Sequence, residues 1–207
     1  MYLRNCCVSK RRTLQFVFAS ILLGMGMLTA STHAQELIAQ TAAMHRHVKH
    51  SQTLLVHPMD STDGMYGGAW KMAKVALQSQ ATPTPKLGSS VVKMSSRAWS
   101  SGAKGDVHVA GNQPGEPTHL GVWVYVDDAS NVASVGYQIY DGEGEALMYK
   151  TELDGFVGGW KFIEADLLGS NMRPAWKQKD KNGKFDYPVK SINIIWFTKA
   201  EGPTQLI

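Results

Sequence analysis

Cysteine is nearly absent from this chain of 207 residues, and both cysteines, Cys6 and Cys7, lie close to its first residue. From residue 8 onward the sequence offers no thiol for a disulfide, a zinc–thiolate site or a cysteine nucleophile. The stability of the rest of the chain must therefore come from packing and hydrogen bonds. A domain of about 150 residues is large enough for this, because it buries roughly two-thirds of its unfolded surface.

Catalytic signatures are missing as well. The sequence contains no G-x-S-x-G nucleophile motif, no H-E-x-x-H zinc motif and no phosphate-binding loop. Glu164 and Asp166 resemble a catalytic pair, since residues two apart on a strand share a face and have Cα atoms roughly 6.6 Å apart. Acidic side chains on an open strand face are usually only solvated, so we expect a protein that is not an enzyme.

The first 34 residues have the pattern of a secretory signal peptide. Four basic residues precede an apolar stretch from 14 to 28. Thr32-His33-Ala34 then has small side chains at the two positions that signal peptidase recognises. We predict cleavage after Ala34, so that residues 1–34 take no part in the fold. The mature protein is then secreted, periplasmic or held in the cell envelope, without stable membrane insertion.

Charge is balanced in the predicted mature chain. The whole sequence has 21 Lys and Arg against 17 Asp and Glu, and the four basic residues of the signal leave 17 of each sign. A neutral chain has no electrostatic attraction to nucleic acid or to acidic lipid. Nucleic acid is therefore not an expected partner.

The mature chain divides into a linker and one domain. Residues 35–52 lack a sustained hydrophobic period, and we interpret them as a linker or a short frayed helix. Residues 53–207 consist of short β-branched and aromatic runs separated by Gly, Asp, Asn and Pro, with no helical pattern between them. This predicts an all-β, antiparallel, two-sheet β-sandwich, or jelly roll. The expected strands are 54–56, 74–78, 90–99, 106–110, 119–126, 135–140, 146–149, 160–167, 191–198 and 204–207. The last one ends with the chain, which suggests a domain truncated in its last strand.

Alternation along two of these strands separates an aliphatic face from an aromatic one. On 119–126 the aliphatic residues alternate with Trp123 and Tyr125. On 135–140 the apolar residues point to one side of the strand, and Gln138 and Tyr140 point to the other side. If the aliphatic sides form the core, these four side chains share a second surface. Rings beside an amide suit a sugar, because a ring covers the sugar's C–H face while the amide meets its hydroxyls. The alternative is that both aromatics of 119–126 are ordinary packing residues.

Three other tryptophans have different expected roles. Trp99 lies at a strand end, and Trp176 lies in the long irregular stretch 169–188. Long loops are often functional, so we add both to the predicted ligand-binding set. Trp196 follows two isoleucines in a continuous apolar run, and we expect it in the core.

Several segments resemble a known family. Leu120-Gly-Val-Trp-Val-Tyr125, Tyr137-Gln-Ile-Tyr-Asp-Gly-Glu-Gly-Glu145 and Gly159-Trp-Lys-Phe-Ile-Glu-Ala-Asp-Leu167 are similar to strands and turns of carbohydrate-binding-module-like, galactose-binding-like jelly rolls. Residues 59–64 resemble their opening turn, and 188–195 and 202–207 resemble their paired closing strands. The similar segments follow one another in the same order as in that family.

The resemblance implies a non-catalytic accessory module that binds polysaccharide or a glycan surface. It also implies that Trp160 packs in the core and that Asp60 is one ligand of a structural calcium ion, although the chain ends before the closing carboxylates of that site. No other cofactor is expected. Two alternatives stay open, namely a structural or protein-interaction sandwich of the cell envelope and a small jelly-roll enzyme that acts on polysaccharide.

Overall fold

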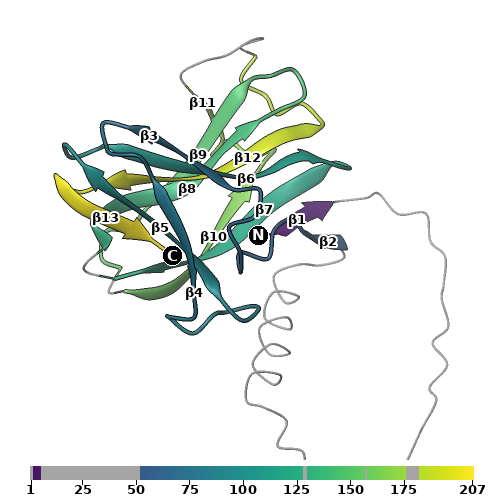
Figure 1. Cartoon of the computed structure of the whole chain (residues 1–207). Helices are drawn as coiled ribbons and strands as arrows, with labels where there is room; N and C mark the ends of the chain where they lie inside the picture. The colour runs from purple at the N-terminus through teal and green to yellow at the C-terminus, as the bar shows by residue number, and fades with distance from the viewer. Residues whose placement is uncertain (1, 6–51, 128–129, 157, 176–181) are drawn as a thin grey trace, which may run out of the picture. The chain divides into compact units, whose positions relative to one another are not determined.

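The computed structural model describes residues 2–5, 52–127, 130–156, 158–175 and 182–207. All regular elements in these ranges are strands, and every pair of neighbouring strands runs antiparallel (Figure 1). The predicted all-β antiparallel sandwich is thus confirmed. Branched and flat side chains dominate these strands because they pack well on a pleated surface.

One layer of the sandwich is a six-stranded sheet with the order β11-β9-β8-β12-β6-β3. Its strands are β3 (Tyr66–Trp70), β6 (Lys104–Gln113), β8 (Val132–Tyr140), β9 (Ala146–Glu152), β11 (Arg173–Pro174) and β12 (Val189–Thr198). Strand β3 is absent from the predicted set, because Gly67 and Gly68 give it a low strand propensity. It forms one edge of the sheet.

The other layer combines a four-stranded sheet, β10-β7-β1-β2, with a three-stranded sheet, β13-β5-β4. Their strands are β1 (Tyr2–Asn5), β2 (Gln52–Leu55), β4 (Ala76–Gln80), β5 (Val91–Ala98), β7 (Pro117–Val126), β10 (Gly159–Asp166) and β13 (Gly202–Leu206). Ile207 joins the two sheets, since its N–H and carbonyl exchange hydrogen bonds with the backbone of Tyr125. The final residues of the chain are therefore part of the layer.

The core lies between the layers and contains the aliphatic sides of both. On β7 the buried aliphatic residues are Leu120, Val122, Val124 and Val126, as alternation predicts. Trp196 on β12 is fully buried, also as predicted, and Gly105 lies beneath its indole. Tyr137 on β8 connects the layers, because its hydroxyl donates a hydrogen bond of 2.7 Å to the carbonyl of Ile163 on β10.

Strands β7 and β8 follow one another in the sequence but belong to different layers. Val126 and Val132, at the two ends of their connection, are both buried in the core, so the chain crosses from one layer to the other between them. The prediction that Trp123, Tyr125, Gln138 and Tyr140 share one surface is therefore wrong. The outer sides of the two strands point in opposite directions.

The N-terminal segment departs from the predicted domain limits. Tyr2–Asn5 forms β1, which pairs with both β2 and β7, although these residues fall within the predicted signal peptide. The expectation that residues 1–34 stay outside the fold does not hold for this strand. The cleavage site at Ala34 and residues 35–51 of the linker lie outside the described residues, and signal cleavage stays a prediction.

Gly105→Ala is expected to lower the free energy of unfolding by about 1–3 kcal/mol. A Cβ at this position would come within 2.2 Å of the buried indole of Trp196, so the added methyl group overfills the core. Chemical denaturation followed by circular dichroism measures the loss. Gly111→Ala on the same strand is the control, because a Cβ there meets no atom closer than 3.4 Å. Equal losses in the two variants would contradict this packing.

Tyr137→Phe should remove a dependence of stability on alkaline pH. Burial, and to a smaller extent the nearby Tyr149 and Glu164, raise the pKa of Tyr137 well above its ordinary value of 10.0. The folded protein thus keeps a proton that the unfolded chain loses, so this contribution is complete below pH 10.0 and declines as pH rises further. Below that pH the variant should be less stable by about 1 kcal/mol, for one lost hydrogen bond. Unfolding curves at increasing pH should show this difference shrinking, and a constant difference would refute the assignment.

Candidate functional site

The outer surface of the six-stranded sheet carries a connected set of polar and aromatic side chains, which we call the polar face. Its members come from four adjacent strands, and those on β6, β12 and β8 alternate with core residues. They are Tyr66 and Trp70 on β3, Lys104, Asp106 and His108 on β6, Ser191 and Asn193 on β12, and Gln138 and Tyr140 on β8.

Strand register brings these distant residues together. His108 is the cross-strand partner of both Tyr66 and Asn193, and Asn193 is in turn the partner of Gln138. The four residues form a row across β3, β6, β12 and β8, with about 4.8 Å between neighbouring strands. Along β6 and β12, the residues next to the row members, such as Val107 and Ile194, point into the core. The row is therefore fixed by the same alternation that builds the sandwich.

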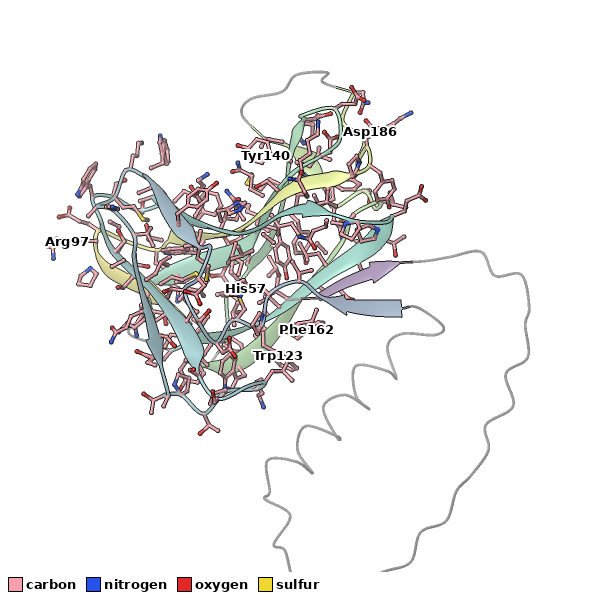
Figure 2. All side chains as sticks on the ribbon, turned by 45° about the vertical axis from the view of Figure 1, so that its right-hand side comes forward. His57, Arg97, Trp123, Tyr140, Phe162 and Asp186 are labelled. Atoms are coloured by element: carbon pink, nitrogen blue, oxygen red, sulfur yellow. The ribbon has the colours of Figure 1, made fainter. Side chains whose placement is uncertain are left out.

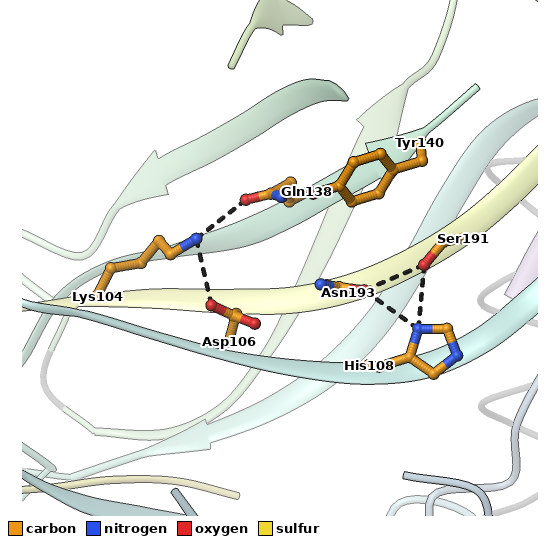
Figure 3. A network of polar contacts seen from close by, with 7 residues as sticks. All are labelled: Lys104, Asp106, His108, Gln138, Tyr140, Ser191 and Asn193. Atoms are coloured by element: carbon orange, nitrogen blue, oxygen red, sulfur yellow. Dashed lines mark hydrogen bonds and ion pairs between the residues drawn. The ribbon is translucent and has the colours of Figure 1, made fainter. Parts of the chain in front are cut away.

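An ion pair and an amide connect one half of the polar face (Figure 3). The amine of Lys104 lies 3.2 Å from a carboxylate oxygen of Asp106 and donates a hydrogen bond of 3.0 Å to Oε1 of Gln138. The amide nitrogen of Gln138 donates in turn to the hydroxyl of Tyr140, at 2.9 Å. Gln138 is only 2% exposed, so its amide is held in one orientation by both neighbours.

His108 organises the other half (Figure 3). Its Nδ1 lies 3.0 Å from the hydroxyl of Ser191 and 3.3 Å from Oδ1 of Asn193. On its other side the ring of Tyr66 stacks on the imidazole, with centroids 4.6 Å apart and an angle of 17° between the planes. The imidazole is thus clamped between a polar pair and an aromatic ring that itself stays 65% exposed.

Two exposed rings on β3 border the polar side chains of β6, β12 and β8, which we call the floor of the polar face. Tyr66 and Trp70 are on the same side of the strand, four residues or about 13 Å apart. Gly68 lies between them, and a Cβ there would come within 2.4 Å of Oδ1 of Asp106. Glycine therefore lets the carboxylate lie against β3 between the two rings. Such a surface offers flat apolar platforms together with fixed donors and acceptors.

Of the predicted ligand-binding residues that the structure describes, the polar face contains Gln138 and Tyr140. Sequence reasoning missed its other members, which come from three further strands. A signal for them exists in the sequence. Lys104, Asp106 and His108 alternate with buried residues on β6, as Ser191 and Asn193 do on β12, and polar residues at alternate positions of core strands mark a single outer face.

Trp123 and Tyr125 alternate with the core residues of β7 and therefore lie on the outer side of the other layer. Figure 2 shows Trp123 away from Tyr140. Trp123 packs against Phe162 with centroids 5.2 Å apart, and Tyr125 meets Trp160 edge-on at 5.5 Å. We call these four residues the aromatic face. The resemblance placed Trp160 in the core, but Ile163 and Ala165 are the inward residues of β10. Trp160 therefore points outward and is half-buried, and that expectation is wrong.

The loop between β4 and β5 covers part of the aromatic face. The indole N–H of Trp160 donates to the carbonyl of Thr84, and the amine of Lys86 lies 5.6 Å from the ring centroid of Trp123. A pocket of about 40 Å³ beside them is lined by Trp123, Trp160 and Lys86, among other residues. The indole nitrogen of Trp123 is buried without a hydrogen-bond partner. These aromatics are partly used for packing the loop.

The remaining predicted residues lie apart from both faces or outside the described part of the chain. Trp99 is exposed just beyond β5, and Trp176 lies outside the described residues. The backbone carbonyl of Asp60 accepts hydrogen bonds from Ser79 and Ser90. Within the described ranges no three His, Cys, Asp or Glu side chains gather as metal ligands do. The structural calcium ion with Asp60 stays a prediction.

The suggested carboxylate pair lies on the outer side of β10. Asp166 is exposed and uses one carboxylate oxygen to accept the N–H of Leu168 at 3.0 Å, which closes the turn after the strand. Glu164 is half-buried and has Gly121 as its cross-strand partner. Asp166 thus has a structural role that does not depend on catalysis.

No family model matches the sequence, and no curated protein matches it. Among solved structures, the chain is similar to a carbohydrate-binding module described for the promiscuous specificity of the β-sandwich superfamily. The two are 10% identical, the match covers 75% of this chain and 65% of that one, and the TM-score is 0.53. The chain thus spans about two-thirds of that protein's length.

Two further similar structures are carbohydrate-binding modules as well. A family 11 module of a cellulosomal cellulase from Clostridium thermocellum is 16% identical over 74% of this chain and 91% of its own, with a TM-score of 0.47. A module studied for specific mannan recognition is 8% identical over 74% and 92%, with a TM-score of 0.45. In the described part of the chain, no helix is long and apolar enough to cross a membrane. The likeness with a TM-score of 0.53 at 10% identity concerns architecture alone, and the chain has the β-sandwich fold of that carbohydrate-binding module.

Lys104→Met is expected to lower the free energy of unfolding by about 1–3 kcal/mol, because Asp106 and Gln138 then lose a charged donor in a poorly hydrated place. Asp106→Ala should also destabilise the fold. The double variant should lose less than the sum of the two single losses, since the ion pair can be removed only once. Urea unfolding of all four proteins tests this coupling, and strictly additive losses would contradict it.

Proposed function

We propose that this protein binds carbohydrate through the polar face and is a non-catalytic, exported module. The observation that carries the proposal is that aromatic rings and polar side chains, the two kinds of group that bind a sugar, lie next to each other on one surface. Exposed rings at Tyr66 and Trp70 border a floor of one buried amide and of half-buried ammonium, carboxylate and imidazole groups. The β-sandwich fold shared with carbohydrate-binding modules supports the same reading.

The floor is suited to neutral hydroxyl groups. A sugar hydroxyl both donates and accepts, and the polar face supplies a donor at Lys104 and acceptors at Asp106 and Asn193. The charges of Lys104 and Asp106 compensate each other, so the floor has no strong preference for an anion or a cation. Because neighbouring groups hold these side chains in place, binding costs little side-chain entropy.

The polar face supports this function better than the aromatic face does. The ring of Trp123 has the amine of Lys86 above it, and Trp160 is tied to the loop through Thr84. Tyr66 by contrast is stacked on one side and open on the other. The prediction that Trp123 and Tyr125 contact the glycan is kept as the competing placement, and the experiment below separates the two faces.

Tyr66→Ala is expected to abolish or strongly reduce retardation in affinity electrophoresis on neutral polysaccharides, such as β-glucan, mannan, xylan and cellulose derivatives. Loss of one stacking ring should weaken binding on the order of tenfold. The protein for this test is the full chain, because β1 pairs with both β2 and β7 in the folded structure. Acidic polysaccharides in parallel gels show whether charge contributes.

Leu168→Ala is the matched control, because it also removes an exposed apolar side chain, at a site away from the polar face. It should migrate like the wild type on every gel. Loss of retardation in Trp123→Ala with retention in Tyr66→Ala would move the site to the aromatic face. Absence of retardation on every polysaccharide would overturn the proposal, and release of new reducing ends would show an enzyme instead.

A further inference from the structure

Two solvent-exposed tryptophans lie at the corner where the chain leaves β3. Trp70 is 53% exposed and Trp99 is 63% exposed. Tryptophan presents one of the largest apolar surfaces of any residue, so two of them left open at one corner indicate a contact surface. Only Trp70 belongs to the polar face, and Trp99 has no part in the site described so far.

Lys71 connects the two tryptophans. Its amine lies 4.5 Å from the ring centroid of Trp70, and its carbonyl accepts a hydrogen bond of 3.0 Å from the N–H of Trp99. Its φ angle of 56° lies in the left-handed region, which non-glycine residues adopt only when the surroundings enforce it. The chain turns sharply here, from the six-stranded sheet toward β5 in the other layer.

Backbone pairing holds the corner rigid on both sides of this turn. Met72 and Ala98 form an antiparallel bridge, and the N–H of Ala73 donates to the carbonyl of Arg97 at 2.9 Å. The segment that carries Trp99 is thus fixed to the segment that carries Trp70. A platform held in this way loses little conformational entropy when a ligand binds.

The corner continues the polar face. Trp70 is the cross-strand partner of Lys104, whose amine joins the network of Asp106 and Gln138. From β8 to β3 the polar face spans three strand spacings, or about 14 Å. Trp99 follows β5 and is held at the turn just after β3, so it lies outside the four strands that form the polar face.

We propose that Trp99, together with Lys71 and Trp70, forms an outlying subsite for the part of a glycan chain that extends past the β3 edge. The inference rests on the proposed function. The ring of Trp99 would cover the C–H face of a sugar unit, and the amine of Lys71 would donate to its hydroxyls. The ligand class is then a linear polymer bound along its length, and a short oligosaccharide engages the polar face alone.

Isothermal titration calorimetry of wild type and Trp99→Ala tests this. The ligands are the neutral polysaccharide that retards the wild type most and the shortest oligosaccharide of it that still binds. Trp99→Ala should weaken binding of the polysaccharide about five- to tenfold and leave binding of the short oligosaccharide unchanged. Trp99 is exposed, and an unchanged unfolding midpoint verifies that the variant is folded.

Two comparison variants make the result specific. Tyr66→Ala should weaken both ligands, because it changes the polar face itself, and Leu168→Ala should weaken neither. Unchanged affinity of Trp99→Ala for the polysaccharide, or an equal loss for both ligands, would overturn the outlying subsite while leaving the proposed function intact. A wild-type protein that binds no polysaccharide would overturn both.

Discussion

The register of β6, β12 and β8 is the constraint on which the rest of this structure depends. On their inner sides these strands place Val107, Ile194 and Tyr137 in the core, and a slip by one residue would turn each of them outward. The same register brings His108, Asn193 and Gln138 into one row on the outer side. The apolar core thus sets the positions of polar groups that it never touches.

Fixed register also explains how a buried polar network is tolerated at the surface of a sheet. A lone amide as buried as Gln138 would be costly, but Lys104 and Tyr140 satisfy its oxygen and one amide N–H. Removing one member leaves its neighbours without a partner, so the network is coupled. A surface that is already ordered before a ligand arrives loses less entropy on binding.

Alternation made the fold and the core faces of β7 and β8 predictable, and Trp196 was placed correctly from its apolar neighbours. The division of β7 and β8 between two layers was not predictable, because the short connection from Val126 to Val132 fits either a hairpin or a crossing. The polar face escaped prediction for a related reason. Its residues Lys104 and Gln138 are far apart in sequence, and only strand order makes them neighbours.

The two aromatic groups of the molecule show that a ring's chemistry alone does not decide its role. Trp123, Tyr125, Trp160 and Phe162 pair across β7 and β10, and the loop from Thr82 to Ser90 lies against them, so much of their surface serves packing. Tyr66 and Trp70 lie on β3, an edge strand of the six-stranded sheet, and both side chains are exposed among the described residues. The ring of Tyr66 stacks on His108 and stays exposed, and Trp70 stays exposed with the amine of Lys71 over its ring. Support from one side with exposure on the other distinguishes a binding platform from a packing residue.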